Sequence, residues 1–312
     1  MDRNNNIIPH ISIYIMTYTH QIANTLNLPS HSVKNTLSLL DQSATIPFIA
    51  RYRKELTGSL DEVQISAIRD TVEQLKALDD RRKSILTSLE KQGILTETLQ
   101  KQVASAPNLT VLEDLYLPHR PKRRTRGTIA RERGLEPLAK AIFSGKPLSL
   151  NIQNFIDFEK GVNEVEDAYA GARDIIAERI NEDISSRKQL RSLFFSRAVI
   201  ISKSIEKNKE NGQKFKDYFL WSEPVTKLAG HRFLAMLRGE KENFLSLTIL
   251  PPEDTALNLL KNKYVYKAHE KPQITLAVED GYNRLLVPSL ENELKKDLKE
   301  KAELEAIEVF GA

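Results

Sequence analysis

The chain has 312 residues and a mass of 35.5 kDa, which at about 150 residues per domain predicts roughly two domains. Hydrophobic residues make up 40% of the sequence and charged residues 28%, a composition that excludes collagen-like, disordered and membrane-spanning proteins. The net charge is only +4, and the lack of cysteine excludes disulfides, thiolate metal sites and a cysteine nucleophile. A sequence of this kind fits the reducing cytoplasm.

Residues 1–15 are predicted to be a disordered or misannotated extension. The apolar stretch Ile7–Tyr18 is interrupted by Pro9 and is shorter than the roughly 20 residues that a membrane-spanning helix needs. The first residues also lack the basic start and the small-residue cleavage site of a signal peptide. Regular helical patterning begins just after Met16, so we assign residues 16–206 to a helical amino-terminal domain.

Apolar residues of this domain recur at intervals of three and four. Ser59–Glu62 has the pattern of a capping box and opens a predicted helix of about 33 residues that ends at Gly93. The charged segment Asp79–Lys83 interrupts its apolar stripe, which predicts either a kink or a passage from one core to another. The other predicted helices are Thr96–Ala104, a short helix opened by a box at Thr110–Glu113, Val165–Asp183 opened by a box at Asn163–Glu166, and a helix capped by Ser185 or Ser186 that runs through Ile201.

The polar segment Lys207–Gly212, with an Asn-Gly turn, is the best internal boundary, so residues 207–312 form a second, mixed but mostly helical segment. Phe244–Leu250 alternates in the manner of a strand, and Tyr264–Tyr266 is its predicted partner. A helical region follows from Ile274 to Phe310, with a break at Pro288. The predicted fold class is therefore mainly α: a multi-helical, elongated amino-terminal region with a helix-turn-helix-like element and a small β component near residues 243–267.

No pattern in the sequence is typical of a catalytic site. The six histidines never form a zinc-protease helix, and the glycine-rich phosphate and dinucleotide motifs and the serine elbow G-x-S-x-G are all missing. The many carboxylates stand beside lysine and arginine on predicted helices, where solvated ion pairs are the rule. We therefore expect no enzymatic activity, no metal site and no cofactor in this chain.

One basic stretch is the strongest candidate site. Leu117–Arg133 contains seven basic residues and a single acid, Glu132, so it carries a net charge of +6 and leaves −2 for the rest of the chain. Pro118 and Pro121 keep the segment extended, and arginine forms bidentate bonds with phosphate. Pairing of the same arginines with acids of neighbouring helices is an equal alternative. The candidate nucleic-acid-binding residues are Arg120, Lys122, Arg123, Arg124, Arg126, Arg131 and Arg133.

Other cationic and aromatic groups have a structural interpretation. A secondary basic cluster, Arg51, Arg53 and Lys54, follows the apolar stretch Ile46–Ala50, where such side chains usually pack their stems and bond to backbone carbonyls. Arg187, Lys188, Arg191 and Arg197 are expected to form a solvated helix face, and the aromatic residues Phe215, Tyr218, Phe219 and Trp221 a small core.

Four blocks, in order from about Met16 to the end of the chain, resemble the Tex family of bacterial transcription accessory proteins. The blocks are Ala44–Glu62; Leu112–Pro118 followed by Pro121–Arg126 and Ala130–Ala139; His231–Glu240; and Asp280–Glu293.

This resemblance implies a part of a larger protein. Tex proteins continue with a RuvC-like YqgF domain, helix-hairpin-helix motifs and a carboxy-terminal oligonucleotide-binding domain, so we expect this chain to be truncated before the YqgF domain. It implies a cytoplasmic, nucleic-acid-binding scaffold acting in transcription, with RNA or DNA as partner and RNA polymerase or ribosome-associated machinery as further candidates. One alternative is a protein-interaction scaffold that docks RNA polymerase or the later domains and touches no nucleic acid. A second is a nuclease, for which this chain would lack the relevant domain.

Overall fold

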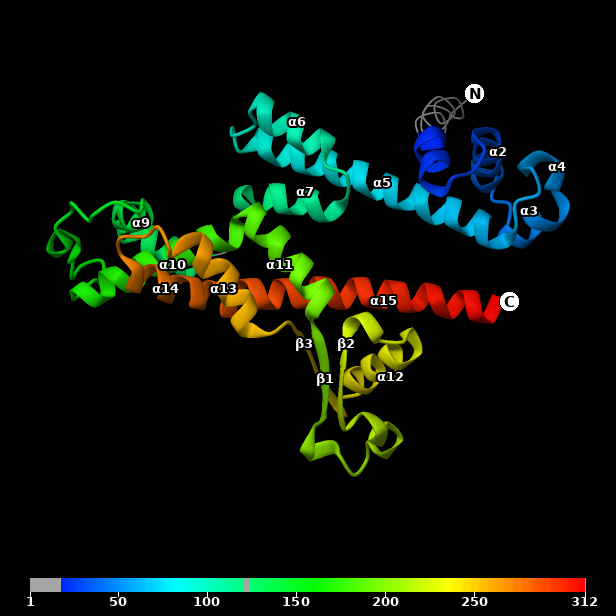
Figure 1. The fold of residues 1–312 in the computed structure, drawn as a ribbon. Coiled ribbons are helices and arrows are strands. Elements are labelled where there is room, and N and C mark those ends of the chain that lie inside the picture. Colours follow the sequence, from blue (N-terminus) through cyan, green and yellow to red (C-terminus); the bar gives the residue numbers. More distant parts are fainter. Residues whose placement is uncertain (1–17, 121–123, 312) are drawn as a thin grey trace, which may run out of the picture. The chain divides into compact units, whose positions relative to one another are not determined.

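The computed structural model describes residues 18–120 and 124–311, with side chains as far as residue 306 (Figure 1). The chain forms two compact units, residues 1–116 and residues 117–312, which we call the first and second units. Helices dominate both units, and a small three-stranded sheet lies in the second, so the predicted fold class is confirmed. The predicted extension, residues 1–15, lies outside the described residues, and the helix-turn-helix-like element stays a prediction.

The first unit is entirely helical in its described part. Residues 18–26 are helical and are followed by helices of very different length. These are α2 (Ser30–Asp41), α3 (Ile46–Tyr52), α4 (Lys54–Thr57), α5 (Glu62–Lys91), α6 (Glu97–Ser105) and α7 (Leu109–Tyr116).

The long helix α5 confirms the prediction from the sequence and serves two cores. Ile65 and Ile68 belong to a cluster with α2 and α3, whereas Leu78, Ile85 and Leu89 belong to a separate cluster with α6 and α7. At about 1.5 Å per residue, its 30 residues are long enough for both. Its charged middle therefore marks a passage between cores.

The predicted helix caps are displaced, although a helix begins near each predicted start. At α5 the cap is Asp61, which accepts from the Gln64 amide at 2.7 Å while the Gln64 side chain accepts from the Asp61 amide at 3.1 Å. Ser59 instead adopts a left-handed backbone, with φ of 65°, in the turn before it. The other observed cap residues are Asn108 for α7, Glu164 for α10 (Val165–Glu182) and Asp183 for α11 (Ile184–Arg197).

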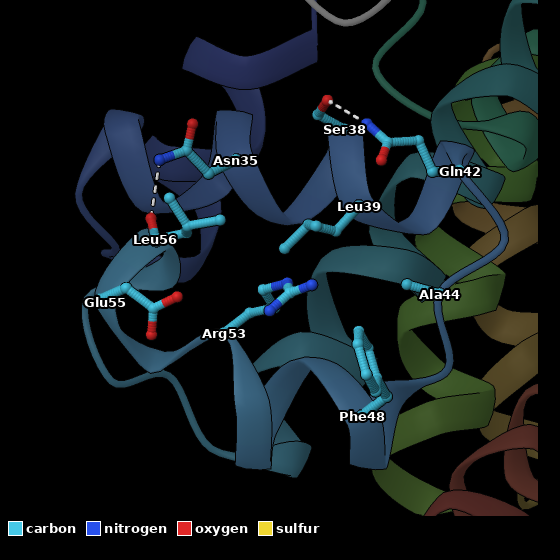
Figure 2. A pocket seen from close by; sticks show the side chains of 9 residues that line it. All are labelled: Asn35, Ser38, Leu39, Gln42, Ala44, Phe48, Arg53, Glu55 and Leu56. Atoms are coloured by element: carbon cyan, nitrogen blue, oxygen red, sulfur yellow. Dashed lines mark hydrogen bonds between the residues drawn. The ribbon is translucent and has the colours of Figure 1, made fainter.

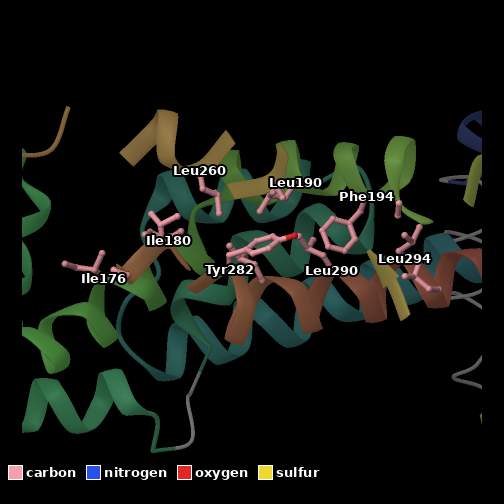
Figure 3. Packing of buried hydrophobic residues seen from close by; sticks show 14 of the residues in the cluster. Ile176, Ile180, Leu190, Phe194, Leu260, Tyr282, Leu290 and Leu294 are labelled. Atoms are coloured by element: carbon pink, nitrogen blue, oxygen red, sulfur yellow. The ribbon is translucent and has the colours of Figure 1, made fainter. Parts of the chain in front are cut away.

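The second unit is built around one large core. Figure 3 shows part of it, where Ile180, Leu190 and Phe194 meet Tyr282 and Leu290. The remaining elements are α8 (Arg126–Glu132), α9 (Glu136–Phe143), β1 (Val199–Ser204), β2 (Leu220–Pro224), α12 (Gly230–Lys241), β3 (Leu245–Leu250), α13 (Glu253–Tyr264), α14 (Lys271–Asp280) and α15 (Val287–Gly311).

The sheet has the order β2-β1-β3 with both pairs antiparallel. The strand predicted at 244–250 is confirmed as β3, but its partner is β1, and the expected partner Tyr264–Tyr266 is the end of α13 and the turn after it. The helix expected through Ile201 ends at Arg197, because the β-branched run that starts at Val199 pairs on both sides.

The predicted boundary at 207–212 falls within the second unit. This segment connects β1 to β2 and contains the end of a short turn, Glu206–Asn208. Residues on both sides of it share the same core, because β1 pairs with β3 across it.

The break expected at Pro288 is wrong, because Pro288 lies in the first turn of α15 and the helical path continues through it. A wide helical turn, Gly281–Leu286, joins α14 directly to α15. Proline has no backbone N–H to donate, and a local change of hydrogen-bond register lets the helical path continue. A Cβ at Gly281 would stand 3.2 Å from the Ala177 carbonyl oxygen, so glycine allows this turn to pack closely on α10.

Candidate nucleic-acid interface

The basic stretch leads into α8, whose position is set by a close contact with α10. The Thr125 hydroxyl caps α8 by accepting from the Thr128 amide at 3.1 Å. An added Cβ at Gly127 would lie 2.4–2.6 Å from the carboxyl group of Glu178, which is almost fully buried. Only glycine lets α8 approach Glu178 this closely.

Arg131 is engaged inside the unit. Its guanidinium donates to Glu178 at 2.9 Å and to Glu136 at 3.1 Å. Burial alone would lower the pKa of Arg131, but the hydrogen bond to Glu178 and the two negative charges outweigh it and raise the pKa. This arginine therefore fits the internal ion-pair alternative and fastens α8 to α10.

The guanidinium groups before α8 and at its first turn are exposed. Arg124 pairs with Glu132 at 3.0 Å, but its side chain is 71% exposed, and such surface pairs contribute little stability. Arg120 and Arg126 are exposed and form no ion pair with another described residue. Internal ion pairing therefore applies to Arg131, whereas Arg120, Arg124 and Arg126 remain candidates for phosphate binding. Lys122 and Arg123 lie outside the described residues.

A turn beside the far end of α8 contains an exposed aromatic residue that the sequence did not single out. The turn 157–162 is closed by two backbone hydrogen bonds of 2.9 Å between Asp157 and Val162, and its Phe158 is 74% exposed. Gly161 in the same turn lies next to the Arg133 guanidinium, 3.4 Å from the position of an ideal Cβ. A phenylalanine in a polar, glycine-containing turn was the available sequence signal.

The secondary basic cluster lies in the first unit. Arg53 donates to the Tyr52 carbonyl at 3.2 Å and stands 5.0 Å from the Phe48 ring centroid, as the packing interpretation predicts. Arg51 pairs with Glu62 at 3.6 Å. Lys54 is exposed and has no ion pair among the described residues.

The aromatic residues near Trp221 belong to the core, and two arginines of α11 form polar contacts with α15. Phe215 is buried, and Tyr218, Phe219 and Trp221 pack against the core, as expected. The solvated face predicted for α11 is wrong at two positions. Arg187 is buried and donates to Ser289 at 3.1 Å, and Arg191 donates to both carboxylate oxygens of Glu293, because α15 covers this side of α11.

The described residues contain no group of three or more side chains placed to hold a metal ion. Within the same residues, no helix is both long and apolar enough to cross a membrane.

Two protein-family models match the sequence of this chain. The family model described as Tex-like protein N-terminal domain matches residues 16–90, which include α2 to α5. The model described as Tex central region-like matches residues 146–310, more than half of the chain and most of the second unit. The two matched ranges correspond to the amino-terminal and central regions of a Tex-type protein. The chain belongs to the Tex family.

Individual relatives agree. The chain is 37% identical over 299 residues to YdcI of Bacillus subtilis (strain 168), and 36% identical over 311 residues to the transcriptional accessory protein Tex of Neisseria gonorrhoeae. These alignments include 93% and 95% of this chain but 41% and 40% of the relatives. The human S1 RNA-binding domain-containing protein 1 is 28% identical over 293 residues, which are 89% of this chain and 29% of that protein. The chain thus spans about two fifths of the length of its bacterial relatives.

Proposed function

We propose that this chain is the helical scaffold of a nucleic-acid-binding transcription accessory protein and that the segment Arg120–Arg126 contacts phosphates. The observation that carries the proposal is that the basic stretch contains both an arginine engaged in internal ion pairs and arginines exposed to solvent. Arg131 and Gly127 hold α8 against Glu178, Arg124 and Arg126 are exposed at the start of that helix, and Arg120 is exposed earlier in the same stretch. Guanidinium groups form strong bidentate bonds with phosphate.

The family and the names of two relatives also support a role in nucleic-acid binding and transcription. One relative is called a transcriptional accessory protein, and another carries an S1 RNA-binding domain in its name. The exposed ring of Phe158, in the turn whose Gly161 lies next to Arg133, offers a surface on which a base can stack. The proposed role is binding rather than catalysis, since the sequence has no motif typical of a catalytic site.

Direct binding tests the proposal. Labelled single-stranded RNA and DNA of mixed sequence are titrated with the chain and with a triple variant, Arg120→Gln, Arg124→Gln and Arg126→Gln. The matched control removes three exposed lysines of α15 by Lys296→Gln, Lys299→Gln and Lys301→Gln, which makes the same change in net charge. We expect the arginine variant to bind at least about tenfold more weakly than the control, because phosphate contacts dominate affinity.

Equal binding by the two variants would contradict the proposal and leave the protein-interaction scaffold as the alternative. That alternative has an observation of its own, because large apolar side chains are exposed between residues 48 and 63 of the first unit.

A further inference from the structure

The first unit contains a groove between α2 and the pair α3–α4 (Figure 2). Its volume is about 610 Å³, within the range of roughly 300–1,000 Å³ that ligand-binding pockets occupy. Leu39, Ala44, Phe48 and Leu56 give it apolar walls, and the Arg53 side chain reaches in between them.

The apolar walls continue into an exposed patch. Phe48 and Leu56 are 39% and 44% exposed, and Tyr52 and Val63 nearby in the sequence are exposed further. The neighbouring residue Ile49 is fully buried in the core beneath, so α3 is held in place while Phe48 stays accessible. Clustered exposure of large apolar side chains is typical of interaction surfaces.

The groove also contains a cation without a carboxylate partner. Arg53 donates to the Tyr52 carbonyl and lies over the Phe48 ring, but it forms no ion pair with any described residue. The segment Arg51–Glu55 has a net charge of +2. The side chain of Asn35 spends one donor on the Leu56 carbonyl at 2.7 Å, and its oxygen can accept from a peptide N–H.

We infer that this groove binds a peptide segment of a protein partner, in which an acidic side chain pairs with Arg53 and a neighbouring leucine- or phenylalanine-like side chain packs between Leu39, Phe48 and Leu56. The charge of Arg53 selects the acid, and the apolar walls select the apolar side chain. A nucleic acid fits less well, because Arg53 is a single cation in the groove lining, whereas a nucleic acid presents a series of phosphates. This inference is independent of the phosphate contacts proposed for the second unit.

A selection with random peptides tests the inference and does not require the partner to be identified first. The full chain is the target, and the variant Arg53→Gln is the counter-target, in display of random 12-residue peptides. We expect the enriched peptides to combine an acidic residue with a leucine, isoleucine or phenylalanine. Enrichment of peptides without acidic residues, or no enrichment over the counter-target, would overturn the inference.

Charge variants of the groove sharpen the test. A selected peptide should bind Arg53→Gln about two- to fivefold more weakly than the original chain, the magnitude expected for one partly exposed ion pair. Glu55→Gln, which removes the acid from the groove wall, should bind the same peptide equally well or more tightly. The control Arg69→Gln removes a cation of α5 that already pairs with Asp70, and it should leave binding unchanged.

Two outcomes would contradict a site for acidic peptides. One is that Arg53→Gln binds the peptide as tightly as the original chain or more tightly, while Glu55→Gln binds it more weakly. The other is that a single-stranded RNA displaces the peptide. Thermal melting of each variant shows whether it is folded. Since Arg53 and Glu55 are not buried, both should melt close to the original chain.

Discussion

Gly127 of α8 packs directly on the carboxyl group of Glu178 in α10. Alanine normally stabilises a helix by about 1 kcal/mol relative to glycine. At Gly127 its Cβ would lie within 2.6 Å of the Glu178 carboxyl group, which Arg131 holds in place. Gly127→Ala should therefore lower the free energy of unfolding by about 1–3 kcal/mol, as for overpacking elsewhere. Urea unfolding measures it, and a variant that gains stability would show that α8 does not need this approach.

The arginines of one stretch should differ in their effect on stability. Arg131→Gln leaves the buried Glu178 with one charged partner fewer and should cost about 1–3 kcal/mol, less than for a fully buried pair because Arg131 is partly exposed. Arg124→Gln removes only a surface pair and should cost less than about 0.5 kcal/mol. Equal losses for the two variants in thermal or urea unfolding would argue against this division.

Tyr282 provides a test at alkaline pH. The side chain is 2% exposed among Ile180, Leu190 and Leu290 (Figure 3), and burial, with a smaller effect of Glu253, raises its pKa to about 12. In the unfolded chain the pKa is near 10. The neutral ring therefore contributes stability that is fully present below pH 10 and is lost as the pH rises towards 12. Tyr282→Phe should make the unfolding free energy fall less steeply between these values, and an unchanged slope would contradict the burial of a neutral phenol.

The sequence could not distinguish the exposed from the engaged arginines. Glu178, which engages Arg131, lies 47 positions away in the chain, and its burial depends on how α8 packs on α10. Charge density can be read from the residues themselves. Which guanidinium finds an acid is a property of tertiary packing, and for that reason the residues alone leave both alternatives open.

Among the helices and strands, local patterns predicted the helices, and non-local pairing explains the errors. The apolar periodicity indicated α5 and its passage between two cores, because Ile65 and Leu89 lie on the same helix but face different partners. The caps are displaced since several serine, threonine and acidic residues compete near each helix start. The prediction of a helix over part of β1 is wrong because the pairing of β1 with β2 and β3, which overrides local propensity, comes from distant sequence.

The turn 157–162 gives a prediction about the type of nucleic acid. Phe158→Ala should weaken binding of single-stranded RNA about fivefold, the lower end for loss of one base-stacking contact, and should leave duplex binding unchanged. Stability should stay the same because the ring is 74% exposed. Phe158→Tyr keeps the stacking surface and serves as the control. If alanine and tyrosine variants bind single strands alike, Phe158 has no part in the interface.

For the whole molecule, packing divides the chain into two units, whereas the positive charge is concentrated in one short stretch. Packing divides the chain at Tyr116–Leu117, where the core of the first unit ends, whereas polar composition suggests 207–212. A polar turn marks a local loop, and it coincides with a division only when no pairing crosses it. The charge, by contrast, is concentrated in Leu117–Arg133, and the remaining chain is slightly acidic. A polyanion should therefore interact mainly with this one stretch.

The salt dependence of nucleic-acid binding is the sharpest test of a phosphate-binding role for this stretch. For single strands, log affinity falls with log salt by about 0.7 for each phosphate contact. We expect the triple variant at Arg120, Arg124 and Arg126 to flatten this slope by about 2, while the lysine variant of α15 leaves it unchanged. Parallel lines for the arginine variant and the original chain would contradict a phosphate-binding role for this segment.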